Sequence, residues 1–257
     1  MLPTEYDVRK LNNPAYALRC LAQGLALLKR PELRKFILIP LLINLVLFAG
    51  AFALAGYFFA DFLQWLIPAW LDWLRWLLWP VFGLAFILMT FFTFTLVANL
   101  LAAPFYDKLA ERTEELLTGS PPRRKDESFA KSVAKEMGAE LRRLLYFVLR
   151  VIPLAILSVI PGVNLVAPFL WMLFNAWFLG LEYTAYPLAN HGLLFPEQRQ
   201  LLKKARLGSL TLGGVVMLGV GVPLLNIVMP PAAVIAATVY FVNARRPARR
   251  QADRPLP

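Results

Sequence analysis

Cysteine and histidine are nearly absent from this sequence, which has one residue of each, Cys20 and His191. A single cysteine excludes an intrachain disulfide, and the two residues together cannot build the usual metal sites of nitrogen and sulfur ligands. The sequence suggests no Ser-His-Asp set, and it has no G-x-x-x-x-G-K-S/T stretch of the kind that binds nucleotide phosphates. We therefore expect no enzyme activity, no metal and no cofactor.

Charge is also scarce. Charged residues make up 17% of the 257, against 59% hydrophobic residues, and the mean hydropathy is +0.58. This composition is too apolar for an ordinary soluble domain and indicates an integral membrane protein. The net charge of +11 comes from cations that flank apolar runs, so we assign it to anionic lipid rather than to nucleic acid. Residues 1–35 lack the features of a secretory signal, so we expect the first span to stay in the mature protein.

An uncharged run of 25 residues, 36–60, directly follows a basic turn at 29–35. At about 1.5 Å per residue this run exceeds the ~30 Å hydrocarbon core of a bilayer, so the sequence predicts a transmembrane helix over 31–60. Pro31 suits the first helical position, and Arg34 and Lys35 follow within a turn. Backbone N–H groups and mobile cations in one small space predict an anion site.

The stretch before this turn, 14–30, predicts an amphipathic helix, because apolar residues recur at three- and four-residue spacing. These residues are Tyr16, Leu18, Leu21, Leu25 and Leu28. Such a helix can lie in the membrane interface or pack on its own protein, and both interpretations stay open. Beyond the first span, five tryptophans between positions 65 and 79 indicate an interfacial belt, and the uncharged run 76–106 predicts the second full transmembrane helix.

Charge returns at 107–143, which has nine Lys or Arg and eight Asp or Glu. A Gly119–Pro122 break between two charged helical patterns predicts a helical hairpin outside the membrane. The first 35 residues have seven cations, the tryptophan-rich connector has one, and this segment has nine. The positive-inside rule therefore places both basic segments in the cytoplasm.

Two further uncharged runs, 151–181 and 207–244, are interrupted by proline and glycine. The second divides into limbs of fourteen residues, 207–220 and 231–244, each about 21 Å long and too short to cross comfortably. We interpret the segments 144–182 and 203–245 as half-penetrating, re-entrant helical hairpins. The alternative is two pairs of kinked spans, which would give six spans. A disordered basic tail, 246–257, completes what we expect to be a single membrane domain, 1–257.

Short motifs are distributed along nearly the whole chain in a fixed order. They are Arg30–Phe36 with Ile39–Asn44, Ala102–Phe105, Ile160–Gly162, Tyr186-Pro187 with Asn190-His191, and Pro223–Asn226 with Met229-Pro230. This ordered set resembles the CysZ family, bacterial inner-membrane proteins of sulfate uptake. The resemblance implies an all-α integral membrane protein with two full transmembrane helices, two re-entrant hairpins and assembly into dimers or larger oligomers. Its implied role is to supply sulfate for cysteine biosynthesis.

The resemblance also implies a sulfate site at the turn before the first span. The family pattern has two adjacent arginines there, which fall on Arg34 and Lys35 in this sequence. Lysine keeps the charge but lacks the planar fork that fits an oxyanion. We take Leu33 and Arg30 as further members of this site. Glu32 competes for the same positive helix end, so it either faces solvent or weakens the site.

Neither central run contains an ionisable residue, so a carboxylate-driven coupling mechanism has no candidate there. We therefore expect a passive, channel-like path between subunits, lined by neutral polar side chains. The candidates are Asn44, Asn99, Asn164 and Asn226, with Thr90 and Thr93. The alternative function is a membrane scaffold or regulatory partner of another permease, which would dock through the charged segment 107–143.

Overall fold

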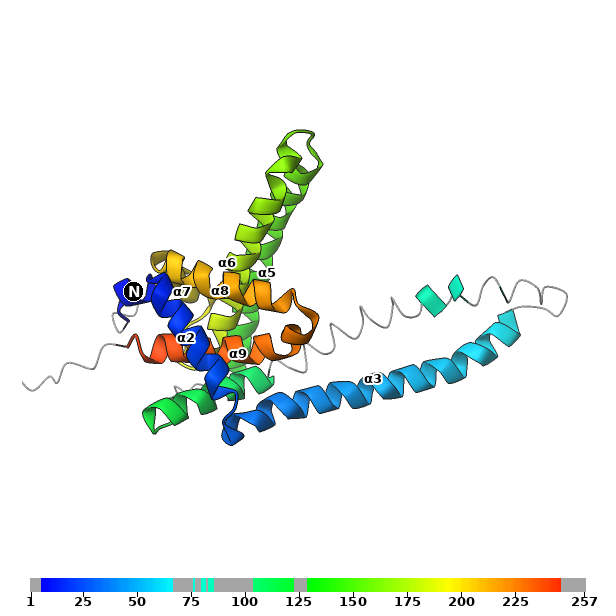
Figure 1. Ribbon diagram of the computed structural model, residues 1–257, viewed down its shortest axis with the longest axis horizontal. Helices are drawn as coiled ribbons and strands as arrows, with labels where there is room; N and C mark the ends of the chain where they lie inside the picture. Colours follow the sequence, from blue (N-terminus) through cyan, green and yellow to red (C-terminus); the bar gives the residue numbers. More distant parts are fainter. Residues whose placement is uncertain are drawn as a thin grey trace, which may run out of the picture. The chain divides into compact units, whose positions relative to one another are not determined.

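The computed structural model describes residues 6–66, 76, 80–81, 83–85, 104–122 and 129–245 (Figure 1). They belong to two compact units, a larger one made of residues 1–34 and 106–257 and a smaller one made of residues 35–105. Within the described ranges the backbone is helical, apart from turns and an isolated bridge between Tyr6 and Arg245. The predicted all-α class is therefore confirmed.

Helix α3, Pro31–Leu66, supplies most of the described part of the smaller unit. It continues through Pro40, and its stretch Pro31–Ala51 is long and apolar enough to cross a membrane. Large side chains such as Leu42 and Leu45 are more than 60% exposed, which suits contact with lipid. The expected second span, 76–106, lies mostly outside the described residues. So does most of the expected tryptophan belt.

Helix α9, Pro223–Val242, lies at the centre of the larger unit. Helices α2 (Pro14–Leu27), α6 (Ala167–Ala189) and α8 (Arg206–Val220) all pack against it (Figure 1). Every residue from 232 to 240 is buried. Where the helices lie in lipid, close van der Waals packing of this surface holds the four together, and where they face water its burial adds the hydrophobic effect.

One limb of the second predicted hairpin differs from our expectation. We expected a short helix over 231–244, but α9 already begins at Pro223, because proline suits the first helical position. Pro230 and Pro231 lie inside the helix, where each removes one backbone hydrogen bond. The packing of α2, α6 and α8 on this segment offsets the loss. As a result, the stretch Leu225–Val242 is long and apolar enough to cross a membrane.

Small residues let α6 and α8 approach closely. Ala176 and Gly180 on α6 face Ser209 and Gly213 on α8, with one helical turn between the two members of each pair. A Cβ atom on Gly213 would overlap the carbonyl oxygen of Ala176, and one on Gly180 would lie 2.7 Å from the carbonyl oxygen of Ser209. This is the small-xxx-small pattern of helix pairs in membranes.

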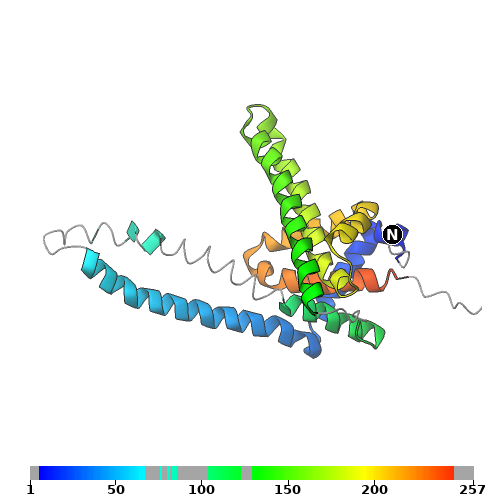
Figure 2. The same cartoon turned by 180° about the vertical axis from the view of Figure 1, so that it is seen from behind.

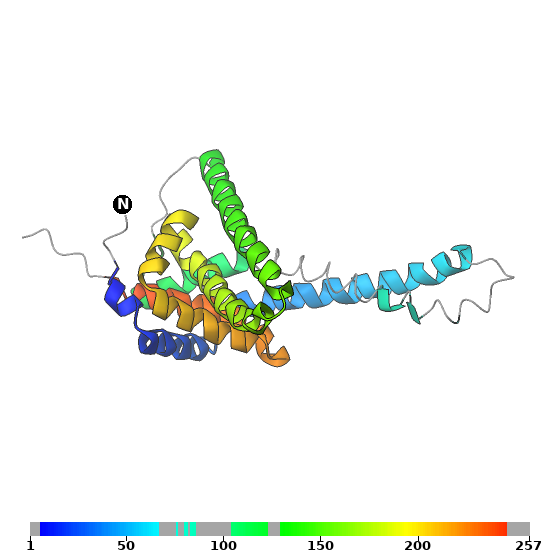
Figure 3. The ribbon, with the colours of Figure 1, turned by 90° about the horizontal axis from the view of Figure 1, so that it is seen from above.

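Helices α5 (Phe129–Val159) and α6 form the first hairpin, and Figures 2 and 3 show them as adjacent ribbons. The turn between them contains a short 3-10 helix, η2 (Val163–Leu165). Gly162 has φ 84°, a conformation that favours glycine, so the predicted turn is confirmed. We expected Pro153 to interrupt the first limb, but α5 continues through it from the charged segment almost to the turn.

Helix α2 packs on α8 and α9, as the second interpretation of this segment predicted, and its place relative to the membrane interface stays a prediction. Its buried face is formed by small residues together with one leucine: Ala17, Cys20, Leu21 and Gly24. Two leucines that we assigned to the apolar face, Leu18 and Leu25, are exposed instead, because glycine and alanine allow the closer helix contact. Burial raises the pKa of the Cys20 thiol to about 11, which keeps it protonated and unreactive.

Three shorter helices complete the described part of the larger unit. They are α1 (Val8–Leu11), a helix over 104–118 and α7 (Phe195–Lys204). The helix over 104–118 ends before Gly119, which has φ 77°, at the break that the sequence predicted. The Asn12 side chain accepts a hydrogen bond of 2.9 Å from the Leu207 N–H and so joins the amino-terminal segment to the start of α8.

Candidate functional site

The basic turn lies between α2 and α3. Helix α2 ends at Leu27, residues 28–30 form the turn, and α3 begins at Pro31. Leu33 is fully buried, which anchors the first turn of α3 by its side chain. The side chains of Arg30, Arg34 and Lys35 are exposed, so the segment presents cations to solvent around one buried leucine.

The backbone donors of this turn are mostly engaged. The N–H groups of Leu33 and Arg34 both donate to the carbonyl oxygen of Arg30, at 3.1 and 3.2 Å. Pro31 has no N–H group. Among residues 30–34, only the Glu32 N–H takes no part in the backbone hydrogen bonds of the turn. An anion at this position therefore depends chiefly on side-chain donors.

Those side-chain donors have different surroundings. Arg30 is the last residue of the turn, and Arg34 lies in the first turn of α3, where its N–H donates to the Arg30 carbonyl oxygen. Lys35 points its ammonium group over the ring of Phe36, with Nζ 5.2 Å from the ring centroid. Within the part of the chain that the structure describes, none of these three cations forms an ion pair with a carboxylate. Their charge is available to an anion.

Glu32 behaves differently from one of our two expectations. Its Oε2 atom is buried and accepts no hydrogen bond from the described residues, so this oxygen does not face solvent. A carboxylate in the first turn interacts favourably with the positive end of α3. The Glu32 carboxylate therefore competes with an external anion at the helix end. An anion would be bound by the arginine and lysine side chains instead.

The expected path-lining residues are placed only in part. Asn164 lies in the exposed turn between α5 and α6, and Asn226 is exposed in the first turn of α9. Asn44 lies within α3. Asn99, Thr90 and Thr93 lie outside the described residues, so the lining of a path remains a prediction.

A buried charged cluster that we did not predict joins three distant segments of the larger unit. Glu114, on the helix over 104–118, is 2% exposed. One of its carboxylate oxygens lies 2.7 Å from His191 Nε2, in the turn after α6, and the other accepts a hydrogen bond of 2.8 Å from Arg245 Nη1, beyond the end of α9. The Glu114 carboxylate thus joins the helix over 104–118 to the segments that follow the ends of α6 and α9.

The electrostatics of this cluster favour an ionised carboxylate. Burial alone raises the pKa of Glu114, but the hydrogen bond and charge of His191 and the charge of Arg245 outweigh it and hold this pKa below its usual range. The helical spacing in the sequence places Leu109, Ala110 and Thr113 on the same face as Glu114, and the structure shows that this face is buried. An acid on a buried face requires a cationic partner.

Comparison with known proteins adds a separate line of support. Residues 20–231 match the family described as "Sulfate transporter CysZ/Etoposide-induced protein 2.4". The chain is 42% identical over 240 residues to a sulfate transporter CysZ of Pseudomonas fluorescens strain Pf0-1, covering 91% of this chain and 94% of the relative. It is 41% identical to the protein of that name from Pseudomonas aeruginosa PAO1, over 91% of this chain and 95% of the relative.

A more distant relative agrees. The sulfate transporter CysZ of Pectobacterium atrosepticum is 39% identical over 231 residues, which cover 87% of this chain and 83% of the relative. The family match and these relatives both extend over most of the chain. The chain therefore belongs to the family of sulfate transporter CysZ and etoposide-induced protein 2.4.

Proposed function

We propose that this protein carries sulfate across the bacterial inner membrane, where the sulfate serves cysteine biosynthesis. The names of its relatives support sulfate as the substrate. Membership of a transporter family also agrees with our expectation that the chain is not an enzyme. The observation that carries the proposal is the group of exposed cations at the start of α3, none of which pairs with a carboxylate in the described ranges.

The chemistry of this group suits sulfate. Sulfate at neutral pH is a dianion without a proton, so a site made only of donors satisfies it, whereas protonated phosphate also needs an acceptor. Arg34 offers a planar fork for two sulfate oxygens, and Arg30, in the turn just before α3, adds a second guanidinium. Lys35 contributes charge with less directional preference. The Leu33 N–H is a weaker contributor because it already donates to Arg30.

The proposed membrane arrangement places this site at the end of a span. Helix α3 crosses the membrane, and the α5–α6 and α8–α9 hairpins enter it and turn back. Leu225–Val242 is long enough to cross, but α8 has only 15 residues, about 22 Å, and cations stand at both outer ends of the α8–α9 hairpin, which favours a return to the same side. The polar backbone of the turns is then exposed only inside the protein or along a watery path. The path runs between subunits of an oligomer and is passive. Asn164 and Asn226, which are exposed in or beside the two turns, are its first candidates for mutation.

Sulfate uptake into liposomes that contain only this protein tests the proposal. We expect uptake driven by the sulfate gradient alone, lost in Arg34→Ala and reduced in Lys35→Ala. Arg19→Ala is the matched control, because Arg19 is also exposed and lies on α2, outside the turn. Equal loss in Arg19→Ala would mean a general charge effect, and a strict requirement for a proton gradient would rule out passive conduction.

The alternative function also has support in the fold. The charged part of α5 exposes large apolar side chains among its charges, including Met137 at 65% and Leu141 at 66%. Met137 and Leu141 are four residues apart and so lie on one face of α5, which a partner docked on the charged segment would cover. If the liposomes show no uptake above empty controls, and a permease copurifies in fixed proportion, the protein is a membrane partner of that permease.

A further inference from the structure

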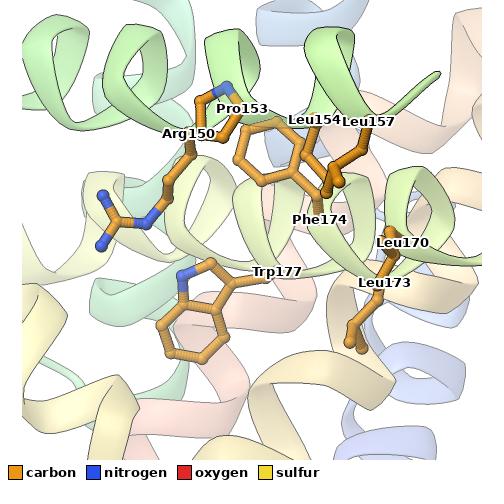
Figure 4. Close-up of a pocket in the computed structure, with 8 residues that line it drawn as sticks. All are labelled: Arg150, Pro153, Leu154, Leu157, Leu170, Leu173, Phe174 and Trp177. Carbon is orange, nitrogen blue, oxygen red and sulfur yellow. The ribbon is translucent and has the colours of Figure 1, made fainter. Parts of the chain in front are cut away.

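An open groove of about 350 Å³ lies between α5 and α6 in the larger unit. Seven of its lining residues are apolar, and one, Arg150, is charged. The lining is Arg150, Pro153, Leu154, Leu157, Leu170, Leu173, Phe174 and Trp177. Figure 4 shows the Arg150 guanidinium and Trp177 toward one end, and Leu157, Leu170 and Leu173 toward the other. The groove therefore has a cationic end and an apolar end.

The cationic end is built by contacts that fix the arginine. The Arg150 guanidinium lies 3.5 Å from the ring centroid of Tyr146, and its Nη1 donates to the Tyr146 carbonyl oxygen at 3.1 Å. Trp177 Nε1 in turn donates to the Tyr146 hydroxyl at 2.9 Å. One guanidinium N–H is used and four remain, so Arg150 is a positioned donor with spare capacity.

A second arginine reinforces the positive charge. Arg199, on α7, lies over the same Tyr146 ring with its guanidinium carbon 4.8 Å from the centroid. In the described residues no carboxylate pairs with Arg150 or Arg199. Arg199 is not part of the groove lining, but because both guanidinium groups lie against one ring, its charge adds to the attraction of Arg150 for an anion in the groove.

The length of the apolar part matches one leaflet of a bilayer. Nine uncharged residues of α5, 151–159, follow Arg150, and they extend about 14 Å. Half of the ~30 Å hydrocarbon core is about 15 Å. Ile152, Ile156 and Val159 on this stretch are all more than half exposed. When the turn of the hairpin reaches the middle of the membrane, Arg150 and Trp177 lie near the headgroups, where tryptophan is enriched.

We propose that this groove binds an anionic phospholipid of the membrane. One acyl chain lies along the leucines between α5 and α6, and the phosphate accepts hydrogen bonds from Arg150 with added attraction from Arg199. A small inorganic anion would use the arginines but not the apolar wall, whereas an uncharged lipid would use the wall but not the arginines. The inference uses the membrane placement of the hairpin proposed above, and it does not depend on sulfate conduction.

Native mass spectrometry of the full-length protein in an uncharged detergent tests the proposal. The probes are phosphatidylglycerol and phosphatidylcholine with identical acyl chains. We expect the wild type to bind phosphatidylglycerol on the order of tenfold more tightly, because charge-assisted hydrogen bonds favour the anionic headgroup. Arg150→Gln should remove this preference. Arg142→Gln, at an exposed arginine earlier on α5, should keep it.

Two further measurements separate the acyl groove from simple charge attraction. Leu157→Trp fills the apolar end without touching an arginine, so it should weaken phosphatidylglycerol binding severalfold even if Arg150→Gln fails to fold. Inorganic phosphate or sulfate at the same concentration should not displace the lipid. Equal loss in Arg142→Gln, no effect of Leu157→Trp, or displacement by inorganic anions would overturn the proposal. Arg34→Ala should retain lipid binding, so a failed sulfate site would be seen separately.

Discussion

Replacing Glu114 with glutamine tests whether one buried carboxylate holds three segments of the larger unit together. Glutamine keeps the shape of the side chain but leaves the Arg245 guanidinium, whose side chain is 29% exposed, without its carboxylate. Breaking a buried ion pair by removing one partner costs about 3–5 kcal/mol, and because Arg245 keeps some access to solvent we expect about 3 kcal/mol. For a protein of this size that loss lowers Tm by roughly 6–12 °C.

The neighbouring residue provides the control. Glu115 pairs with Arg112 at 2.5 Å, but both side chains are more than a third exposed. An exposed pair of this spacing contributes about 0.5 kcal/mol, so Glu115→Gln should lower Tm by only about 1–2 °C. Thermal unfolding of the purified protein in detergent, followed by tryptophan fluorescence, measures both variants. Equally small shifts in the two variants would refute the assignment of Glu114 as a structural tie.

Acid should act on the same contact. Because the pKa of Glu114 in the fold lies below its usual range, its stabilisation is fully present above the ordinary glutamate pKa of about 4.3. It is lost as the pH falls through the lowered pKa. The wild type should therefore lose more stability than Glu114→Gln when the pH is lowered from 6 to 3. Parallel curves for the two proteins would contradict this sign.

Other contacts give shorter tests. Gly213→Ala should destabilise the α6–α8 contact by about 3 kcal/mol, because its Cβ would overlap a backbone oxygen, whereas Gly214→Ala, with 3.7 Å to the nearest atom, should be neutral or stabilising in the same Tm assay. Asn12→Ala leaves the Leu207 N–H without its acceptor and should lower the free energy of unfolding by about 1 kcal/mol, measured by denaturant titration. Lys35→Arg should tighten sulfate binding severalfold in calorimetry, since a planar fork replaces a point charge.

The turn of the first hairpin could be predicted from the sequence because its signal is local: Gly162 adopts a left-handed backbone conformation that few other residues adopt. The start of the second turn was also predicted, but the helix after it begins at Pro223 rather than at residue 231. Proline inside a helix was a poorer guide. Pro153 and Pro230 signalled interruptions, yet both lie within helices. Whether a helix continues past a proline depends on the packing of other helices on it, which one sequence does not reveal.

The basic turn and the Glu114 cluster also differed in how far the sequence could predict them. The cations at the basic turn are neighbours in the sequence, so their local placement followed from spacing alone. Glu114 lies 77 residues from His191 and 131 from Arg245, and no periodicity relates these positions. Only the face of the helix on which Glu114 lies could have indicated that it needed a partner. Its identity as a structural tie depends on the fold.

The cations behind the net charge of +11 differ in whether a carboxylate neutralises them. Arg245 is neutralised by buried Glu114, and Arg112 and Arg143 pair with glutamates three residues away. In the described ranges the basic turn gathers several cations without carboxylate partners, and in the groove Arg150, also without one, is fixed beside an apolar wall. At these two places we expect anions. The turn offers a group of cationic side-chain donors, which suits an inorganic dianion, whereas the groove adds an apolar wall to its arginine, which suits a lipid. Arg34→Ala should therefore abolish sulfate uptake and spare lipid preference, and Arg150→Gln should abolish lipid preference through a contact that the sulfate site does not use.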